Sequence, residues 1–207
     1  MVGPGTRMSA REEMLSAIRR ANASATDTPV PRDYERRSPH SPSELLDLLT
    51  DRLVDYKATV VRVPLSELPT ALADAVAPYS PVLVPPDQPW DLDATPDSPA
   101  LGPHDLDGFA AVVTGCAVAC AETGTIALDG GPAQGRRAIT LVPDVHVCVV
   151  HGSQVVGSVP EMIAALTPTR PITFVSGPSA TSDIELQRVE GVHGPRTLIV
   201  VLACEWQ

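Results

Sequence analysis

The segment TVVRVPLSELPTALADAVAPYSPVLV, residues 59–84, decides the fold class of this chain. Its two ends, 59–63 and 81–84, are rich in valine, as β-strands are, and the stretch 66–77 between them has the pattern of a helix. A strand, a helix and a second strand in succession are typical of a parallel sheet with helices on its faces. We therefore expect an α/β fold with a mostly parallel sheet flanked by helices.

Upstream of this segment the sequence predicts two helices separated by a linker. Two serine–glutamate pairs are spaced as capping boxes, which mark helix starts: Ser9 with Glu12, and Ser41 with Glu44. The first pair opens a helix over 8–23, and the second opens a helix with a leucine stripe. Residues 26–42 are rich in proline and charge, which indicates a linker. We expect residues 1–42 to form an N-terminal helix and flexible linker, and 43–207 to form the α/β domain.

Downstream, short apolar stretches alternate with turns and capped helices. Further strands are expected at 110–114, 125–128, 138–142, 146–150, 172–175 and 197–203. Ser158 with Glu161 caps a helix that runs through Leu166, and a short helix is expected over 182–188. The segment 85–108 holds six aspartates, six prolines and no lysine or arginine. It is either a solvated loop or a lid over a site.

Composition and charge exclude several classes of protein. A hydrophobic content of 43% with 19% charged residues is that of a soluble globular protein. The net charge of −10 argues against non-specific binding to nucleic acid or to acidic membranes, because both require a basic surface. No apolar run is long enough for a membrane span, and the N-terminus lacks the apolar core of a secretory signal. We expect a cytoplasmic protein.

The four cysteines allow a metal interpretation, but a simpler one is favoured. Cys116, Cys120 and Cys148 lie near His146 and His151 in the sequence, and this set contains zinc-ligand types. However, Cys204 and the other three cysteines all lie in apolar runs, where a reduced cysteine acts as a small buried hydrophobe. We expect no metal in this chain.

A first polar cluster lies at 121–125, where Glu122 is followed by Thr123, Gly124 and Thr125. A carboxylate beside a glycine turn can act as a nucleophile or general base, while nearby N–H groups hold an oxyanion. Alternatively, Glu122 only caps the turn and the threonines satisfy backbone groups. The sequence favours this structural interpretation.

A second cluster lies at 130–137, where three glycines precede the paired arginines Arg136 and Arg137. Glycines allow close backbone approach, and arginines suit carboxylate or phosphate oxygens. A hairpin loop with two solvated arginines is equally compatible. Downstream, Asp144 and His146 join two expected strands and are predicted to lie near the same rim.

The third cluster, 175–196, combines hydroxyls, carboxylates, arginines and a histidine. Its first half precedes the expected helix, whose free N–H groups favour an anion, and its second half is a glycine-punctuated loop. His193 is the best-placed general acid or base among the histidines, although a purely structural turn is an alternative. The predicted catalytic residues are Glu122 and His193, and the predicted ligand-binding residues are Thr123, Gly124, Thr125, Arg136, Ser176, Gly177, Ser179, Thr181, Asp183, Glu190 and Arg196.

Five motifs occur in series and carry a family resemblance. They are ETGTI at 122–126, GRRA at 135–138, VPDVH at 142–146, SGPSATSDIE at 176–185 and EGVHGPR at 190–196. Together they closely resemble the lactate utilization protein C family, the single-domain members of the LUD group. The match is dense from about Asp107 to the C-terminus.

The resemblance implies a fold like that of the sugar-phosphate isomerase and CoA-transferase superfamily. It also implies a role in oxidising L-lactate to pyruvate with two partner proteins that carry iron–sulfur clusters. Because this chain lacks the clustered cysteine motifs that such clusters need, we expect no cofactor here and place the clusters on the partners. The chain would then be a non-redox component that binds a small anionic metabolite. Alternatives are a stand-alone CoA-transferase-like or isomerase-like enzyme that uses Glu122, and a scaffold without chemistry.

Overall fold

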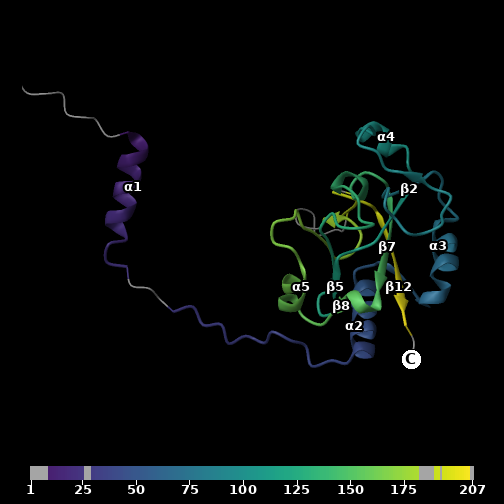
Figure 1. Cartoon of the computed structure of the whole chain (residues 1–207), viewed down its shortest axis with the longest axis horizontal. Helices are drawn as coiled ribbons and strands as arrows, with labels where there is room; N and C mark the ends of the chain where they lie inside the picture. Colours follow the sequence, from purple (N-terminus) through teal and green to yellow (C-terminus); the bar gives the residue numbers. More distant parts are fainter. Residues whose placement is uncertain (1–8, 26–28, 182–188, 192, 206–207) are drawn as a thin grey trace, which may run out of the picture. The chain divides into compact units, whose positions relative to one another are not determined.

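The computed structural model describes residues 9–25, 29–181, 189–191 and 193–205 (Figure 1). For Thr181, Val189 and Glu190 it describes the backbone. The chain separates into two compact units, Met1–Tyr34 and Glu35–Gln207.

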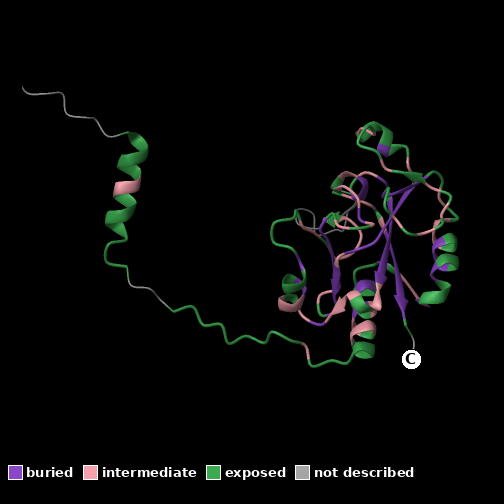
Figure 2. Cartoon of the chain, viewed as in Figure 1, coloured by how far each residue is buried: buried purple, intermediate pink, exposed green. Residues whose placement is uncertain are grey.

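The first unit contains one helix, α1 (Ala10–Ala21), within its described residues. The Ser9 side chain accepts a hydrogen bond from the Glu12 N–H, and the Glu12 carboxylate accepts one from the Ser9 N–H, so the predicted capping box is confirmed. No residue of α1 is buried (Figure 2). Local capping therefore defines this helix, and burial contributes little to it.

The second unit is organised around a parallel sheet of six strands. Their order across the sheet is β1 (Thr59–Pro64), β12 (Thr197–Cys204), β7 (Val145–His151), β4 (Ala111–Thr114), β2 (Val82–Val84) and β3 (Thr95–Pro96). Every neighbouring pair in this sheet runs parallel. The central strand β7 is buried along nearly its whole length, which explains its run of valines.

Alternate residues of the central strands face two separate cores. Val145, Val147 and Val149 pack with α3 (Leu68–Val76), which follows a short 3-10 turn, η1 (Leu65–Glu67). Cys148 and Val150 face the other way and pack with α2 (Pro42–Asp55). Figure 1 shows α3 on one side of β7 and β12, and β5 on the other. The helices thus flank the sheet, and the predicted α/β fold class is confirmed.

A second, smaller sheet of four strands packs against the α2 side of the first. Its order is β8 (Val155–Val156), β5 (Val118–Cys120), β6 (Thr125–Leu128) and β9 (Thr173–Val175). β6 runs antiparallel to both of its neighbours. The helix α5 (Val159–Ala165) packs on this sheet through Met162 and the adjacent Leu166. The sequence did not predict β5, because its three buried residues follow an equally apolar segment without a turn signal.

The predicted strand over 138–142 is wrong. Residues Arg137–Thr140 form a 3-10 turn, η2, in which the Leu141 N–H donates to the Ala138 carbonyl. Ile139 is fully buried in a small cluster with Leu83 and Val112, and this packing favours a turn over an extended strand. The remaining short elements are α4 (Pro103–Asp107), η3 (Gly152–Gln154) and the antiparallel pair β10 (Ala180–Thr181) with β11 (Val189–Glu190).

The helix expected over 182–188 lies outside the described residues. Among those described, no helix has the length and apolar character that a membrane span requires.

Candidate functional site

A hollow of about 270 Å³ lies where the two sheets meet, at the amino-terminal ends of β7 and β12. His146 and Leu198, each the second residue of its strand, form part of its wall. The other walls come from η2, from β9 with the loop 176–179, and from the loop 193–195. The hollow therefore gathers side chains from the second and third polar clusters of the sequence.

Arg137 is the cation of this hollow. Its guanidinium Nη1 donates to the Thr140 hydroxyl at 2.9 Å, and within the described part of the chain it forms no ion pair. Arg137 is exposed as a whole residue, and partial loss of solvation by its guanidinium lowers the pKa of Arg137. A bound anion would restore the interactions that this partly desolvated cation has lost.

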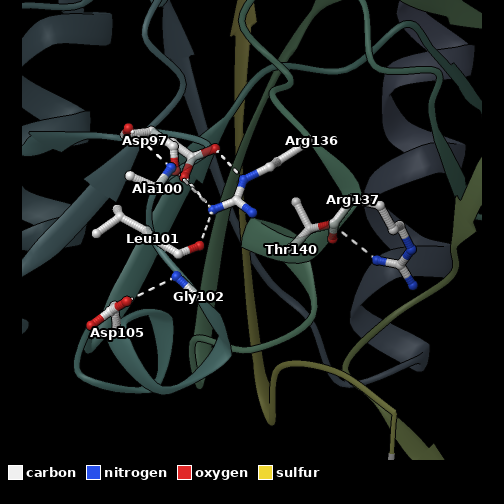
Figure 3. A network of polar contacts seen from close by, with 9 residues as sticks. Asp97, Ala100, Leu101, Gly102, Asp105, Arg136, Arg137 and Thr140 are labelled. Carbon is white, nitrogen blue, oxygen red and sulfur yellow. Dashed lines mark hydrogen bonds and ion pairs between the residues drawn. The ribbon is translucent and has the colours of Figure 1, made fainter.

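The neighbouring Arg136 points the opposite way and is fully engaged. Figure 3 shows its guanidinium directed toward the 97–101 segment, whereas Arg137 extends away from it. Nε and Nη2 of Arg136 donate to both carboxylate oxygens of Asp97 at 2.8 and 2.9 Å. Nη2 also donates to the Ser98 and Leu101 carbonyls, and the ion pair with Asp97 raises the pKa of Arg136. Arg136 thus holds the 85–108 segment against the body.

The 85–108 segment has further attachments. The Ala133 N–H donates to the Asp87 carboxylate at 3.1 Å, and Trp90 packs against the core on the α3 side. The segment also supplies strand β3 and helix α4. Two of its acidic residues therefore bind the body: Asp87 through the Ala133 N–H and Asp97 through Arg136. The sequence pattern alone did not show whether this segment is a loop or a lid.

His146 closes the inner end of the hollow. Its side chain is 2% exposed and shares a 2.8 Å hydrogen bond with the Thr114 hydroxyl on the adjacent strand. Burial, together with the positive charge of Arg137, lowers the pKa of His146 to about 4. His146 is therefore neutral at pH 7 and contributes a hydrogen-bonding group, but no charge, to the hollow.

A chain of hydroxyls links the first cluster to the third. The Thr123 hydroxyl donates to the Thr125 hydroxyl at 2.8 Å, and Thr125 shares a 2.8 Å hydrogen bond with the Ser176 hydroxyl. Ser176 lines the hollow. The structure therefore brings three of the predicted ligand-binding residues together, with Ser176 as the member that reaches the site.

Two glycines allow these turns to rest on the end of α2. Gly124 has a φ of +62°, and a Cβ on it would lie 2.8 Å from the Arg52 Cβ. Gly177 has a φ of +118°, and a Cβ on it would lie 2.8 Å from the Tyr56 Cβ. Their predicted ligand contacts stay predictions, and the structure gives both glycines a role in close backbone packing.

His193 and Ser179 lie on facing loops at the rim. The His193 N–H donates to the Ser179 hydroxyl at 2.9 Å, and the Ser179 N–H donates to the Pro195 carbonyl at the same distance. Both residues line the hollow, and the acid–base role of His193 stays a prediction. Nearby, Arg196 forms a 2.6 Å ion pair with Asp144, at the wall of an adjoining hollow of about 470 Å³.

Glu122 lies apart from His193. It is exposed on the turn between β5 and β6, where its N–H donates to the Gly157 carbonyl and its own carbonyl accepts from Arg52 Nε. It is not among the residues that line the hollow with His193. The catalytic role of Glu122 stays a prediction, and these contacts are those of a turn anchor.

The other predicted site residues lie in or beside β10 and β11. Thr181 pairs with Val189, and Ala180 pairs with Glu190, so the backbones of the predicted residues Thr181 and Glu190 belong to one small ribbon. Asp183 lies outside the described residues.

Sequence reasoning missed a buried polar network in the second cluster. The Asp129 carboxylate is 7% exposed and accepts hydrogen bonds from the Gly131 N–H, the Gln134 amide and Arg170 Nη1, each at 3.0 Å. Burial alone would raise the pKa of Asp129, but these three donors outweigh it and lower the pKa. The network fixes the loop before Arg137. The signal in the sequence was an aspartate at the end of an apolar strand, where an unpaired charge is costly.

No three histidine, cysteine, aspartate or glutamate side chains of the described residues come together as a metal site. All four cysteines are buried with free thiols, and the neighbouring Cys148 together with burial raises the pKa of Cys116. The four cysteines are divided between two core clusters and do not form the grouped ligand set that an iron–sulfur cluster requires.

The fold and the site define an α/β protein with a cation-lined hollow between two sheets. Residues 105–203 match the family model described as the LUD domain. A "Lactate utilization protein C" from Deinococcus radiodurans is 46% identical, over 93% of this chain and 95% of that protein. One from Geobacillus kaustophilus is 31% identical, over 75% of this chain and 77% of that protein.

A solved structure agrees with these relatives. The crystal structure of a DUF162 family protein from Deinococcus radiodurans superposes with a TM-score of 0.68 at 39% identity, over 80% of this chain and 99% of that one. The chain belongs to the lactate utilization protein C family of LUD-domain proteins.

Proposed function

We propose that this chain is a non-redox component of a lactate utilization system and that it binds a small organic anion at Arg137. The names of its relatives support the system. The observation that supports the binding role is Arg137 itself, which lines the hollow and has no acidic partner in the described part of the structure.

The surroundings of Arg137 suit a carboxylate. The Ser176 and Ser179 hydroxyls offer hydrogen bonds, and His193 can give or accept a proton at the rim. Because His146 is neutral at pH 7, the positive charge that the anion would contact is that of Arg137. Arginine binds a carboxylate through paired N–H groups, which fixes its orientation as well as its position.

The electron-transfer centres belong, in this proposal, to iron–sulfur partner proteins. The four cysteines of this chain are buried within the two sheets as core residues. The chain would therefore bind and present a metabolite within the system, while the partners carry electrons.

Ligand binding can be tested by thermal unfolding with L-lactate, pyruvate and inorganic phosphate. Ligand at about 100 times its dissociation constant should stabilise the fold by about 2.7 kcal/mol. Arg137→Gln should abolish this response, because the amide carries no charge. Arg19→Gln, a matched change in the last turn of α1, should leave it intact. A response that survives Arg137→Gln would place the anion elsewhere.

The role in lactate utilization has a separate test. Deletion of the gene in its host should prevent growth on L-lactate, and growth should return with the wild-type chain but not with Arg137→Gln. Affinity capture with the wild-type chain should recover cysteine-rich iron–sulfur proteins from lactate-grown cells. Normal growth of the deletion strain on L-lactate would refute the proposal.

A further inference from the structure

A second hollow, of about 640 Å³, adjoins the first at Arg137. Arg137, Thr140 and Thr173 line both hollows, so the two share a wall that includes Arg137. Pockets that hold drug-sized ligands have volumes of roughly 300–1,000 Å³. The second hollow falls in that range, which is far more space than a three-carbon acid fills.

The second hollow is mainly apolar away from Arg137. Leu128, Pro171, Ile172, Gly130 and Gly135 are among its lining residues. The Leu128 side chain packs into the core with α2 and the Ile172 side chain packs on the α5 side, so Pro171 and the glycine backbone supply the accessible apolar surface. Its other cation, Arg136, is already engaged by Asp97 and two carbonyl groups. Its amide, Gln134, is engaged at both ends by Asp129. The hollow therefore offers contact area and little free hydrogen-bonding capacity.

We propose that the two hollows form one site, and that its ligand is a monocarboxylic acid whose apolar side chain is longer than the methyl group of lactate. The carboxylate lies on Arg137, and the side chain extends over Pro171 and the backbone of Gly130 and Gly135. This inference rests on the proposed function, since it requires Arg137 to bind the anion, and it adds the class of ligand.

The charge balance favours a monocarboxylate over a phosphate. Among the described residues at the junction, Arg137 is the one cation without an acidic partner, and His146 is uncharged at pH 7. A carboxylate is neutralised by one arginine, whereas a phosphate dianion would keep a net charge in a partly enclosed, partly apolar site.

The test is a calorimetric titration of the full chain with pyruvate, 2-oxobutanoate, 2-oxopentanoate and 2-oxohexanoate. Burial of each added methylene should tighten binding about fourfold, which corresponds to about 0.8 kcal/mol per CH₂. Equal affinities along the series would overturn the proposal, and so would tighter binding of inorganic phosphate or of an alkyl phosphate of equal length.

A variant that fills the second hollow supplies the matched control. Pro171→Trp, at an exposed position that lines the second hollow, should keep the affinity for pyruvate and remove the gain along the series. Ile163→Trp, at an exposed position on α5, should leave the full gain. A gain that persists in Pro171→Trp would overturn the proposal.

The outcomes separate this inference from the proposed function. If no acid binds, both fail. If pyruvate binds and Arg137→Gln abolishes that binding, but chain length has no effect, the anion site stands and the two-hollow site is refuted.

Discussion

At the scale of single residues, the hollow depends on a histidine that stays neutral. His146 is enclosed by β4 and β7 and lies near the positive charge of Arg137. A protonated His146 would be an unsolvated charge in the core and would also be repelled by Arg137, which is why the pKa of His146 falls from 6.5 to about 4.

This pKa predicts a loss of stability in mild acid. Below pH 6.5 the histidine takes up a proton in the unfolded chain, whereas in the folded chain it does so only near pH 4. The free energy of unfolding therefore decreases as the pH is lowered from 6.5 toward 4. Between pH 7 and pH 5 the loss should be about 2 kcal/mol, measured by urea denaturation. His146→Gln should remove most of this loss.

The control for this pH effect is the exposed His104 of α4. His104→Gln should show the same loss as the wild type. Asp129 and Glu161 have lowered pKa values, so their protonation affects stability only at lower pH than that of His146. An unchanged free energy of unfolding from pH 7 to pH 5 would contradict the lowered pKa of His146.

The turn that carries Ser176 and Ser179 requires a glycine at position 177. Gly177→Ala places a Cβ 2.8 Å from the Tyr56 Cβ and 2.9 Å from the Tyr56 carbonyl oxygen, at a φ that side chains rarely adopt. We expect a loss of about 2–4 kcal/mol in urea denaturation, with a weaker ligand response because Ser176 and Ser179 shift.

Gly152→Ala is the matched control for Gly177→Ala. The nearest atom to its new Cβ is 3.6 Å away, which is ordinary contact, and its φ is not in the left-handed region. It should cost less than about 1 kcal/mol. Equal losses for the two variants would show that the turn is not tightly packed on α2.

At the scale of elements, the same capping box has different consequences in the two units. Ser41 and Ser9 each accept a hydrogen bond from the N–H of a glutamate three residues on. α2 buries Leu49 and Leu53 completely, whereas α1 buries nothing.

Removing each cap tests this difference. Ser41→Ala should lower the free energy of unfolding by about 1 kcal/mol, because α2 is part of the cooperative core. Ser9→Ala should leave that free energy unchanged and reduce only the helical signal in far-ultraviolet circular dichroism. If the two variants are equally destabilised, α1 must unfold together with the core.

The elements that the sequence predicted well are those with local signals. The capped helices begin at the predicted serines, and β6 has the predicted bounds, because caps and short apolar runs bounded by turn residues act over a few residues. The strand predicted over 138–142 is wrong because Ile139 packs with residues distant in the sequence, and that packing favours a turn. Propensity is weak compared with such tertiary contacts.

At the scale of the whole molecule, the two units should be separable. Deletion of residues 1–34, the first compact unit, should leave the urea midpoint and the ligand response of the remaining chain unchanged. Deletion of residues 1–55 also removes α2 with its buried leucines, and this shorter chain should not fold. Circular dichroism and urea denaturation distinguish the outcomes, and a lowered midpoint in the first deletion would show that the units stabilise one another.

The sequence by itself determined the helix caps, most strands of the parallel sheet, the family motifs and the buried state of the cysteines. These follow from local propensity and from hydrophobic patterning, which are properties of neighbouring residues. Only the tertiary structure decided which of two adjacent arginines is available to an anion, and that Glu122 and His193 do not line the same hollow. The physical reason is that charge pairing and desolvation depend on distant partners. Asp97 engages Arg136, whereas the exposed Arg137 has no acidic partner among the described residues, and burial keeps His146 neutral.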